Sequence, residues 1–198
     1  MNIIVATGNM NKAREIKEIL NIPNLTVQTM KEANINVEII EDGNTFLENA
    51  MKKATAVYNA SDKNSIVIAD DSGICIDYLD GAPGIYSARF SGENATDEEN
   101  NNKLIDLLKD VKPEDKTAKY VCSFAVIMPN GDTFDTLGEF YGTLIDSPRG
   151  TNGFGYDPLF YLPEYQQTVA EISSELKNKI SHRAIALDKL KEELKALL

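Results

Sequence analysis

A short apolar run that ends in two adjacent carboxylates constrains the fold of this chain more than any other stretch. Residues 66–69 are Ile-Val-Ile-Ala, a composition that suits a strand buried on both faces of an α/β sheet. Asp70, Asp71, Ser72 and Gly73 follow, and Asp, Ser and Gly are favoured in turns. On these residues alone, we predict that the strand stops and the chain turns. Ligands collect at the carboxyl ends of strands in open α/β sheets, so the same residues are also candidates for a binding site.

Composition narrows the classes of protein that fit. The chain has 198 residues, of which 42% are hydrophobic, so it can bury a sizeable core as one large domain or two small lobes. Its net charge of −11 argues against a nucleic-acid-binding surface but leaves room for a small phosphate ligand. No apolar run approaches the roughly 20 residues that span a bilayer, and we expect no membrane partner. Cys75 and Cys122 lie in apolar segments, which predicts free thiols and a cytoplasmic location.

Hydrophobic periodicity predicts strands and helices in mixed order. We expect strands over 2–6, 25–28, 66–69, 74–78, 119–128, 133–144 and 159–162, and helices over 11–20, 45–60, 96–108, 173–179 and from 181 onwards. The Pro-Asn-Gly-Asp sequence at 129–132 predicts a hairpin, so the sheet is expected to be mixed. Thr45 and Glu48 have the spacing of a capping box, which gives Glu48 a structural role.

Two of the predicted helices begin with basic side chains. Lys12 and Arg14 lie in the first turn of one helix, and His182 and Arg183 in the first turn of the last. A cation at a helix N-terminus opposes the helix dipole at a cost of about 0.3–1 kcal/mol, and a bound anion removes that conflict. One such misfit is compatible with a solvated surface. Two of them predict two walls of an anion site.

Six segments, in order and at compatible spacing, carry a resemblance to a known family. They are residues 7–12, 45–50, 70–73, 81–89, 153–158 and 181–183. With them the chain resembles, over nearly its whole length, the noncanonical purine nucleoside triphosphate pyrophosphatases, the inosine/xanthosine triphosphatase family. The resemblance implies Mg²⁺-dependent hydrolysis of inosine, deoxyinosine and xanthosine triphosphates to the monophosphate and pyrophosphate. It also implies a single domain over residues 1–198, with an elongated mixed central sheet flanked by helices, two lobes with a cleft between them, and a homodimer.

The resemblance assigns a role to each candidate site residue. Lys12 contacts phosphate within a triphosphate cradle formed by Thr7, Gly8, Asn9, Met10, Asn11 and Lys12. Glu41 and Asp71 are the metal-associated carboxylates, Asp71 is also the proton acceptor for the attacking water, and Lys53 lies near the phosphates. Nucleotide contacts come from Ser72 and Lys177, the base pocket from Phe154, Gly155, Tyr156 and Asp157, and reading of the purine 6-oxo group from His182 and Arg183. Asp70 is expected to support Asp71, and Asp42 leaves one position of ambiguity for the metal acid.

Two other functions stay open from the sequence. A purine nucleotide sensor that does not hydrolyse its ligand would need no metal acids, so Glu41, Asp71 and Lys12 count against it. A pyrophosphatase with a different base preference would not need His182 and Arg183, so these residues count against it. The preferred nucleotide and the number of metal ions do not follow from residue types.

Overall fold

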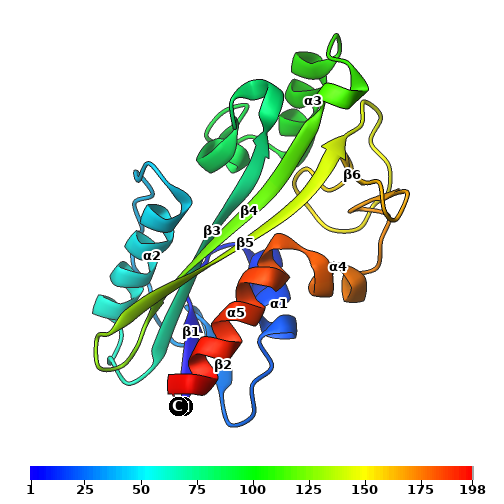
Figure 1. Cartoon of the computed structure of the whole chain (residues 1–198). Helices are drawn as coiled ribbons and strands as arrows, with labels where there is room; N and C mark the ends of the chain where they lie inside the picture. Colours follow the sequence, from blue (N-terminus) through cyan, green and yellow to red (C-terminus); the bar gives the residue numbers. More distant parts are fainter. Residues whose placement is uncertain (198) are drawn as a thin grey trace. The chain divides into compact units, whose positions relative to one another are not determined.

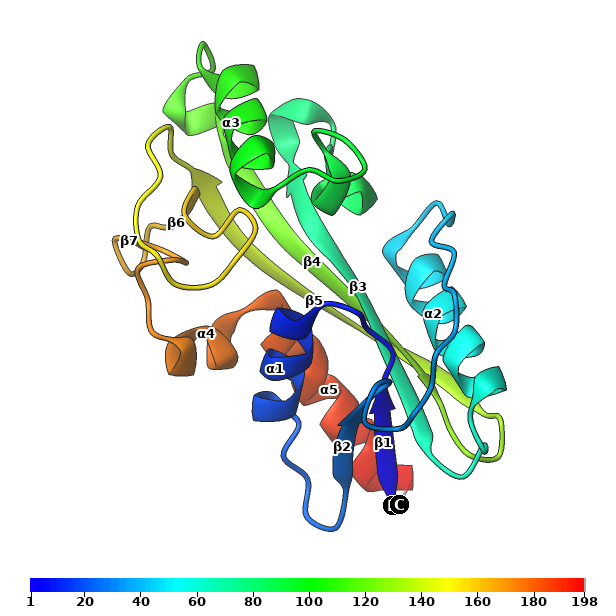
Figure 2. The ribbon, with the colours of Figure 1, turned by 180° about the vertical axis from the view of Figure 1, so that it is seen from behind.

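A computed structural model describes residues 1–197 of the chain (Figures 1 and 2). Its strands are β1 (Asn2–Val5), β2 (Thr26–Thr29), β3 (Ile66–Ile76), β4 (Thr117–Ile127), β5 (Thr133–Leu144), β6 (Phe160–Leu162) and β7 (Gln167–Thr168). Its α-helices are α1 (Met10–Ile19), α2 (Phe46–Ala60), α3 (Asp97–Leu108), α4 (Ser174–Ile180) and α5 (His182–Leu197). Short 3₁₀ turns cover Asp77–Leu79, Gly84–Arg89 and Pro113–Asp115. Within residues 1–197, every helix is too short or too polar to cross a membrane.

The strands form one mixed sheet in the order β2-β1-β3-β4-β5-β6-β7. β1 pairs in parallel with both β2 and β3, whereas β6 pairs antiparallel with β5 and β7. The mixed sheet with flanking helices, predicted from the sequence, is therefore confirmed.

The predicted turn at Asp70–Gly73 is wrong. β3 runs without a break from Ile66 to Ile76, and both aspartates lie inside it. Turn propensity is a weak local preference, and here it yields to the hydrogen bonds of the strand ladder. The apolar residues Ile74 and Ile76, both fully buried, continue the strand beyond the polar residues.

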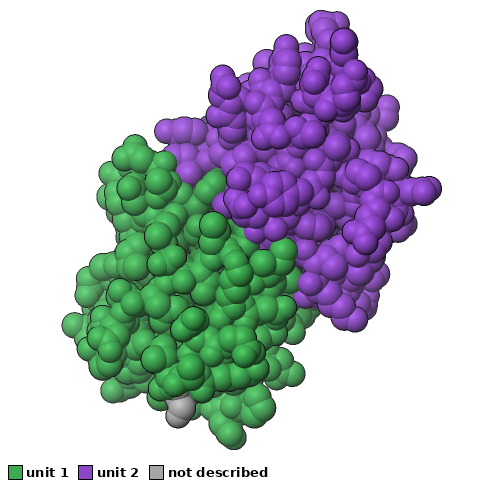
Figure 3. Space-filling view, in the orientation of Figure 1, with its two compact units in different colours: residues 1–71, 122–138, 183–198 green, residues 72–121, 139–182 purple. Residues whose placement is uncertain are grey.

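The chain forms two compact units (Figure 3). Unit 1 contains residues 1–71, 122–138 and 183–198, and unit 2 contains residues 72–121 and 139–182. β3, β4 and β5 each contribute residues to both units. The cleft implied by the family resemblance stays a prediction.

The core of unit 1 has two layers because side chains alternate along its strands. Ile66 and Ile68 of β3 pack with residues of α1 and α5. Val67 and Ala69 point the other way and pack with Ala50, Ala54 and Val57 of α2. Figure 2 accordingly shows α2 on one side of β3, and α1 with α5 on the other.

Unit 2 has one apolar core that joins helices to the remaining strand segments. Ile74 and Ile76 of β3 pack there with Leu104 and Leu108 of α3 and with Phe160 of β6. Thr96 and Glu99 form a complete capping box at the start of α3, as the spacing of these residues in the sequence indicates. The loop 153–158 contacts both this core and the capped helix: Tyr156 belongs to the core, and Gly155 is hydrogen-bonded to Asp97 and Asn101 of α3.

Candidate active site

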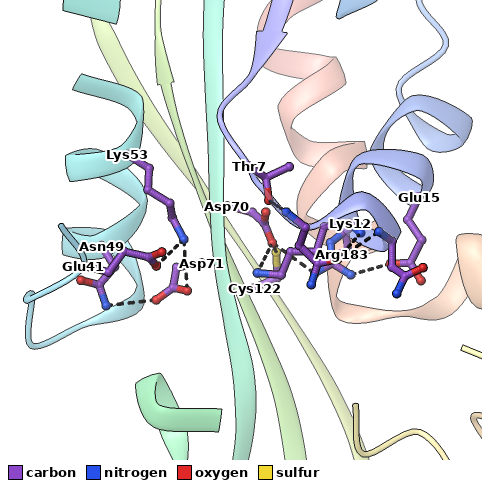
Figure 4. Close-up of polar contacts among 12 residues, drawn as sticks. Thr7, Lys12, Glu15, Glu41, Asn49, Lys53, Asp70, Asp71, Cys122 and Arg183 are labelled. Atoms are coloured by element: carbon purple, nitrogen blue, oxygen red, sulfur yellow. Dashed lines mark hydrogen bonds and ion pairs between the residues drawn. The ribbon is translucent and has the colours of Figure 1, made fainter. Parts of the chain in front are cut away.

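Asp70 and Asp71 lie on opposite faces of β3, because consecutive strand residues point in opposite directions. Asp70 continues the series of Ile66 and Ile68, and Asp71 continues that of Val67 and Ala69. Figure 4 shows the consequence: Asp71 faces α2 and Asp70 faces α1. Both side chains are largely shielded from solvent, with 1% of Asp70 and 7% of Asp71 exposed. One strand thus supplies a carboxylate to each of two environments, and the expectation that Asp70 supports Asp71 is wrong, because Asp70 contacts Lys12 and Arg183 on the opposite face.

On the α2 side, one ammonium group contacts two carboxylates. Lys53 Nζ lies 2.6 Å from Glu41 Oε2 and 3.4 Å from Asp71 Oδ1. Burial raises the pKa of Asp71, and the positive charges of Lys53 and Lys12 only partly oppose this. Burial alone would lower the pKa of Lys53, but the carboxylates of Asp71, Asp70 and Glu41 raise it above its ordinary value. Lys53 is therefore a protonated, buried amine, and Asp71 is a carboxylate with a raised affinity for a proton.

Asn49 fixes Asp71 from the same helix. Its side-chain amide donates to Asp71 Oδ2 at 3.2 Å, and its Oδ1 accepts the Gly43 N–H at 2.8 Å. Asn49 is one turn before Lys53 on α2, so both side chains project from one face. A Cβ on residue 43 would lie 2.7 Å from Asn49 Oδ1, so this close approach requires glycine. Thr45 caps the helix, since its side chain accepts the Glu48 N–H; the predicted capping box is only half formed, because the Glu48 carboxylate accepts the Asn44 N–H.

The neighbouring acid, Asp42, is directed elsewhere. It contacts Lys52, and both side chains are substantially exposed. Glu41 contacts Lys53 and Asp42 contacts Lys52. Because these consecutive lysines project from different faces of α2, the two acids point to different places. The acid that shares an ammonium with Asp71 is Glu41.

The residues near Asp71 fit a divalent cation by the chemistry of their donors. Glu41 and Asp71 both direct carboxylate oxygens at one cationic group, Lys53 Nζ. No group of three or more His, Cys, Asp or Glu side chains within residues 1–197 is arranged to hold a metal. Mg²⁺ commonly binds through one or two carboxylates, waters and the phosphates of its substrate, so two carboxylates suffice.

On the α1 side, Asp70 is held by two cations. Lys12 Nζ and Arg183 Nη2 lie 3.2 and 3.1 Å from the same oxygen, Asp70 Oδ2. Arg183 is 1% exposed, and its Nη1 donates to Glu15 Oε2 at 2.5 Å. Burial alone would raise the pKa of Asp70, but Lys12 and Arg183 hold it well below its ordinary value. Asp70 is thus a permanent carboxylate within a buried ionic network.

The predicted triphosphate cradle, residues 7–12, contacts this network through Lys12. α1 begins at Met10, and the Asn9 side chain caps it by accepting the N–H groups of Asn11 and Lys12. Thr7 Oγ1 accepts the Asn9 N–H at 3.2 Å. Residues 8–11 are exposed, and the Lys12 side chain contacts Asp70. Two of the first-turn N–H groups are therefore occupied by Asn9, whereas the loop before them is open to solvent.

The predicted base-pocket residues gather within unit 2. Lys177 Nζ lies 2.7 Å from Asp157 Oδ2 and 4.6 Å from the ring centre of Phe154. Tyr120 donates its hydroxyl to Asp157 Oδ1 at 3.1 Å, and its ring stacks on that of His182 with centres 4.7 Å apart. Burial, together with Asp157, raises the pKa of Tyr120 well above its ordinary value, so the hydroxyl remains a donor.

The other predicted residues of unit 2 have a structural setting. Gly153 has a φ of +76°, and a Cβ there would lie 2.0 Å from Asp157 Oδ2. The Phe154 N–H donates to that same oxygen at 3.0 Å. Gly155 bonds through its N–H to Asp97 at 2.7 Å, and buried Tyr156 donates its hydroxyl to the Ser87 carbonyl, also at 2.7 Å. Ser72 is half-buried within β3.

Comparison with known proteins decides the family. The sequence model of the Ham1 family matches residues 3–193. The chain belongs to the Ham1 family. A dITP/XTP pyrophosphatase of Clostridium perfringens is 46% identical in an alignment of 199 positions that covers 98% of each chain. One from Listeria monocytogenes is 48% identical over 192 residues, covering 97% of this chain and 94% of that protein. The structure of the Staphylococcus aureus Ham1 protein covers 100% of both chains with a TM-score of 0.88 at 39% identity.

Three polar residues of this Ham1 chain escaped the sequence analysis. Glu15 and Asn49 lie on the buried faces of α1 and α2, and Tyr120 lies in β4. Asn49 and Lys53 are four residues apart beside the apolar stripe of α2, which is a signal that could have identified them as a pair. Glu15 lies between buried Ala13 and Ile16, an unusual place for a carboxylate without a partner. Tyr120 carried no signal, because a strand aromatic is ordinarily a core residue.

Proposed function

We propose that this chain is a Mg²⁺-dependent nucleoside triphosphate pyrophosphatase that hydrolyses deoxyinosine, inosine and xanthosine triphosphates to the monophosphate and pyrophosphate. Its Ham1 family membership supports the proposal, as do relatives named dITP/XTP pyrophosphatase at 46–48% identity. The observation that carries it is the cluster on the α2 side of β3, where Glu41 and Asp71 share the ammonium of Lys53.

Each group of that cluster, together with Lys12 beside Asp70, suits one part of the reaction. Asp71 accepts a proton from the attacking water, and the raised pKa of its carboxylate makes it a better proton acceptor than an exposed aspartate. Lys12 and Lys53 neutralise charge on the phosphates, which phosphoryl transfer needs more than covalent chemistry. Glu41 and Asp71 would hold Mg²⁺, and the bound ion would stabilise negative charge on the reacting phosphate.

The base would be recognised by the unit 2 cluster. Phe154 offers an aromatic face beside the Lys177 ammonium, and His182 is held by its stack on Tyr120. A 6-oxo purine presents an acceptor where adenine presents a donor, so donor side chains favour the oxo base. Arg183 donates to Glu15 and Asp70, so it would reach a base only by exchanging one of these partners.

The decisive experiment is incubation of the protein with Mg²⁺ and deoxyinosine triphosphate, with separate assays for pyrophosphate and orthophosphate. We expect pyrophosphate. Binding without turnover would support the nucleotide sensor instead, and orthophosphate alone would refute the position of cleavage. With adenosine triphosphate in place of deoxyinosine triphosphate, turnover should be much slower. Equal rates for the two nucleotides would support a different base preference.

A matched pair of variants tests the metal carboxylate. We expect Glu41→Gln to reduce turnover by on the order of 100-fold, the scale at which loss of one charge-stabilising group acts. Asp42→Asn removes the neighbouring acid, which contacts exposed Lys52, and should leave turnover within about twofold. The reverse result would move the metal site to Asp42.

The resemblance also implies a cytoplasmic homodimer, and we include both in the proposal. Light scattering at micromolar concentration and fractionation of the native cell test these two points directly.

A further inference from the structure

The Lys53 ammonium occupies the place between two carboxylates that the proposed function assigns to a metal. Its Nζ lies 2.6 Å from Glu41 Oε2 and 3.4 Å from Asp71 Oδ1. Lys53 and Asp71 have side chains that are 8% and 11% exposed, so water screens their contact little, whereas the Glu41 side chain is 37% exposed and its end of the arrangement is partly screened. Asn49 holds the second Asp71 oxygen, which directs the first towards Lys53. The contact is thus built by the protein and differs from a solvated surface pair such as Lys52 with Asp42.

We propose that Lys53 is an internal counter-cation that a divalent cation must displace from Glu41 and Asp71. This inference rests on the proposed function for the identity of the site, and it adds a property of the free protein. Without metal, Lys53 neutralises the two acids. When a divalent cation binds them, Lys53 leaves the carboxylates and its ammonium becomes available to another anion.

Simultaneous occupancy is disfavoured by charge and by space. The two carboxylates carry two negative charges, and an ammonium with a divalent ion would place three positive charges on them. At contacts of 2.6 and 3.4 Å, Lys53 already takes up one oxygen of each acid. Repulsion between cations at this range is strong where the effective dielectric constant is low.

The lysine side chain can make the move. Its ammonium sits on a flexible four-carbon stem, whereas its backbone is fixed in the middle of α2. Within the proposed function, the triphosphate is the anion that receives the freed ammonium. Binding of metal would thereby prepare Lys53 to contact phosphate, and a phosphate bound there would favour the metal in return.

Metal affinity of the nucleotide-free protein tests the displacement. Binding of Mn²⁺ is followed by loss of the free-ion signal in electron paramagnetic resonance. We expect Lys53→Met to bind Mn²⁺ at least about tenfold more tightly than the wild type, which corresponds to about 1.4 kcal/mol. Lys52→Met, on the adjacent residue of α2, should leave the affinity unchanged. Lys12→Met is the control for the electrostatic field of nearby positive charges. The Lys12 ammonium contacts Asp70, but its charge also acts on Asp71.

A second measurement uses the wild-type chain and needs no variant. Acetic anhydride labelling, read by peptide mass spectrometry, reports how accessible each lysine is. Saturating Mn²⁺ should increase the labelling rate of Lys53 several-fold and leave that of Lys52 unchanged. Equal Mn²⁺ affinity of wild type and Lys53→Met would overturn the proposal, as would an equal gain from Lys12→Met or unchanged labelling of Lys53.

These outcomes separate the inference from the function on which it rests. If the protein shows the Lys53 effects but releases no pyrophosphate from deoxyinosine triphosphate, the proposed activity is refuted and the displacement of Lys53 is supported. If it hydrolyses the nucleotide without the Lys53 effects, the activity is supported and the displacement is refuted.

Discussion

The two adjacent aspartates of β3 should respond in opposite ways to the same substitution. Asp70→Asn and Asp71→Asn each remove one negative charge from neighbouring positions of one strand, so each is the control for the other. We expect Asp70→Asn to destabilise the fold strongly. We expect Asp71→Asn to leave the free energy of unfolding within about 1 kcal/mol of the wild type, or to raise it, because ionised Asp71 is disfavoured by burial.

The magnitude follows from the partners of Asp70. Arg183 Nη2 and Lys12 Nζ lie 3.1 and 3.2 Å from one oxygen of a side chain that is 1% exposed. Removing one partner of a buried ion pair costs about 3–5 kcal/mol, since the remaining charge stays buried. Asparagine keeps an acceptor oxygen, and Arg183 keeps Glu15, so we expect the lower end, about 3 kcal/mol.

The contributions of Asp70 and Asp71 to the free energy of unfolding should also change with pH in opposite directions. The folded chain holds the pKa of Asp70 below its ordinary value, so the stability it contributes is complete above that ordinary value, near 4. It is lost as the pH falls through the pKa of the folded chain. The pKa of Asp71 is raised, so its contribution is present below the ordinary value and is lost as the pH rises through its folded pKa. The difference in stability between the variants should therefore be large at pH 7 and shrink in acid.

Urea unfolding at pH 7 measures these differences. The chain has eight tyrosines and no tryptophan, so tyrosine fluorescence and far-ultraviolet circular dichroism provide two signals. With an m-value of about 3 kcal/mol per molar urea, a loss of about 3 kcal/mol lowers the midpoint by about 1 M. Equal midpoints for the two variants, or a loss below about 1 kcal/mol in Asp70→Asn, would refute the assignment of Asp70 as the structural member of the pair.

Two further predictions concern unit 2. Gly153→Ala should lower the free energy of unfolding by at least about 1 kcal/mol more than Gly155→Ala. Both glycines have positive φ, but only a Cβ at position 153 would clash with Asp157. Thermal unfolding of both variants measures the difference. Tyr120→Phe should cost about 1 kcal/mol, since it removes the hydrogen bond to Asp157 and retains the ring that stacks on His182; a cost near zero in urea unfolding would show that this bond adds nothing to the fold.

Much of the fold could be predicted because its signals are local. The continuous apolar run of β1 and the helix caps at Thr45 and Thr96 depend on neighbours within a few residues, and the corresponding elements are present. The capping box is complete at Thr96, whereas at Thr45 the Glu48 carboxylate accepts the Asn44 N–H instead. The turn predicted at Asp70–Gly73 failed for the opposite reason. Whether two aspartates stay in a strand depends on the neighbouring strands of the sheet and on partners from α1, α2 and α5, all of which lie far away in sequence.

The candidate site shows the same division. The family motifs predict Asp71, Lys12 and Lys53 as site residues, but they do not identify the partners of these residues. Arg183 and Glu15 are 168 positions apart, and no local pattern reports a contact over that distance. Pairing of charges across a fold becomes visible only when the elements that carry them are placed together.

The register of β3 ties the chemistry of the site to the packing of the core. β3 pairs with β1 so that Ile66 is opposite Ile3, Val67 opposite Ile4, and Ile68 opposite Val5. Because side chains alternate with a period of two, a shift of one residue would exchange every side chain between the two faces. Asp70 would then face α2, and Asp71 would face Lys12 and Arg183. The apolar residues that fix this register therefore also determine which aspartate is held as a permanent carboxylate and which is available to accept a proton.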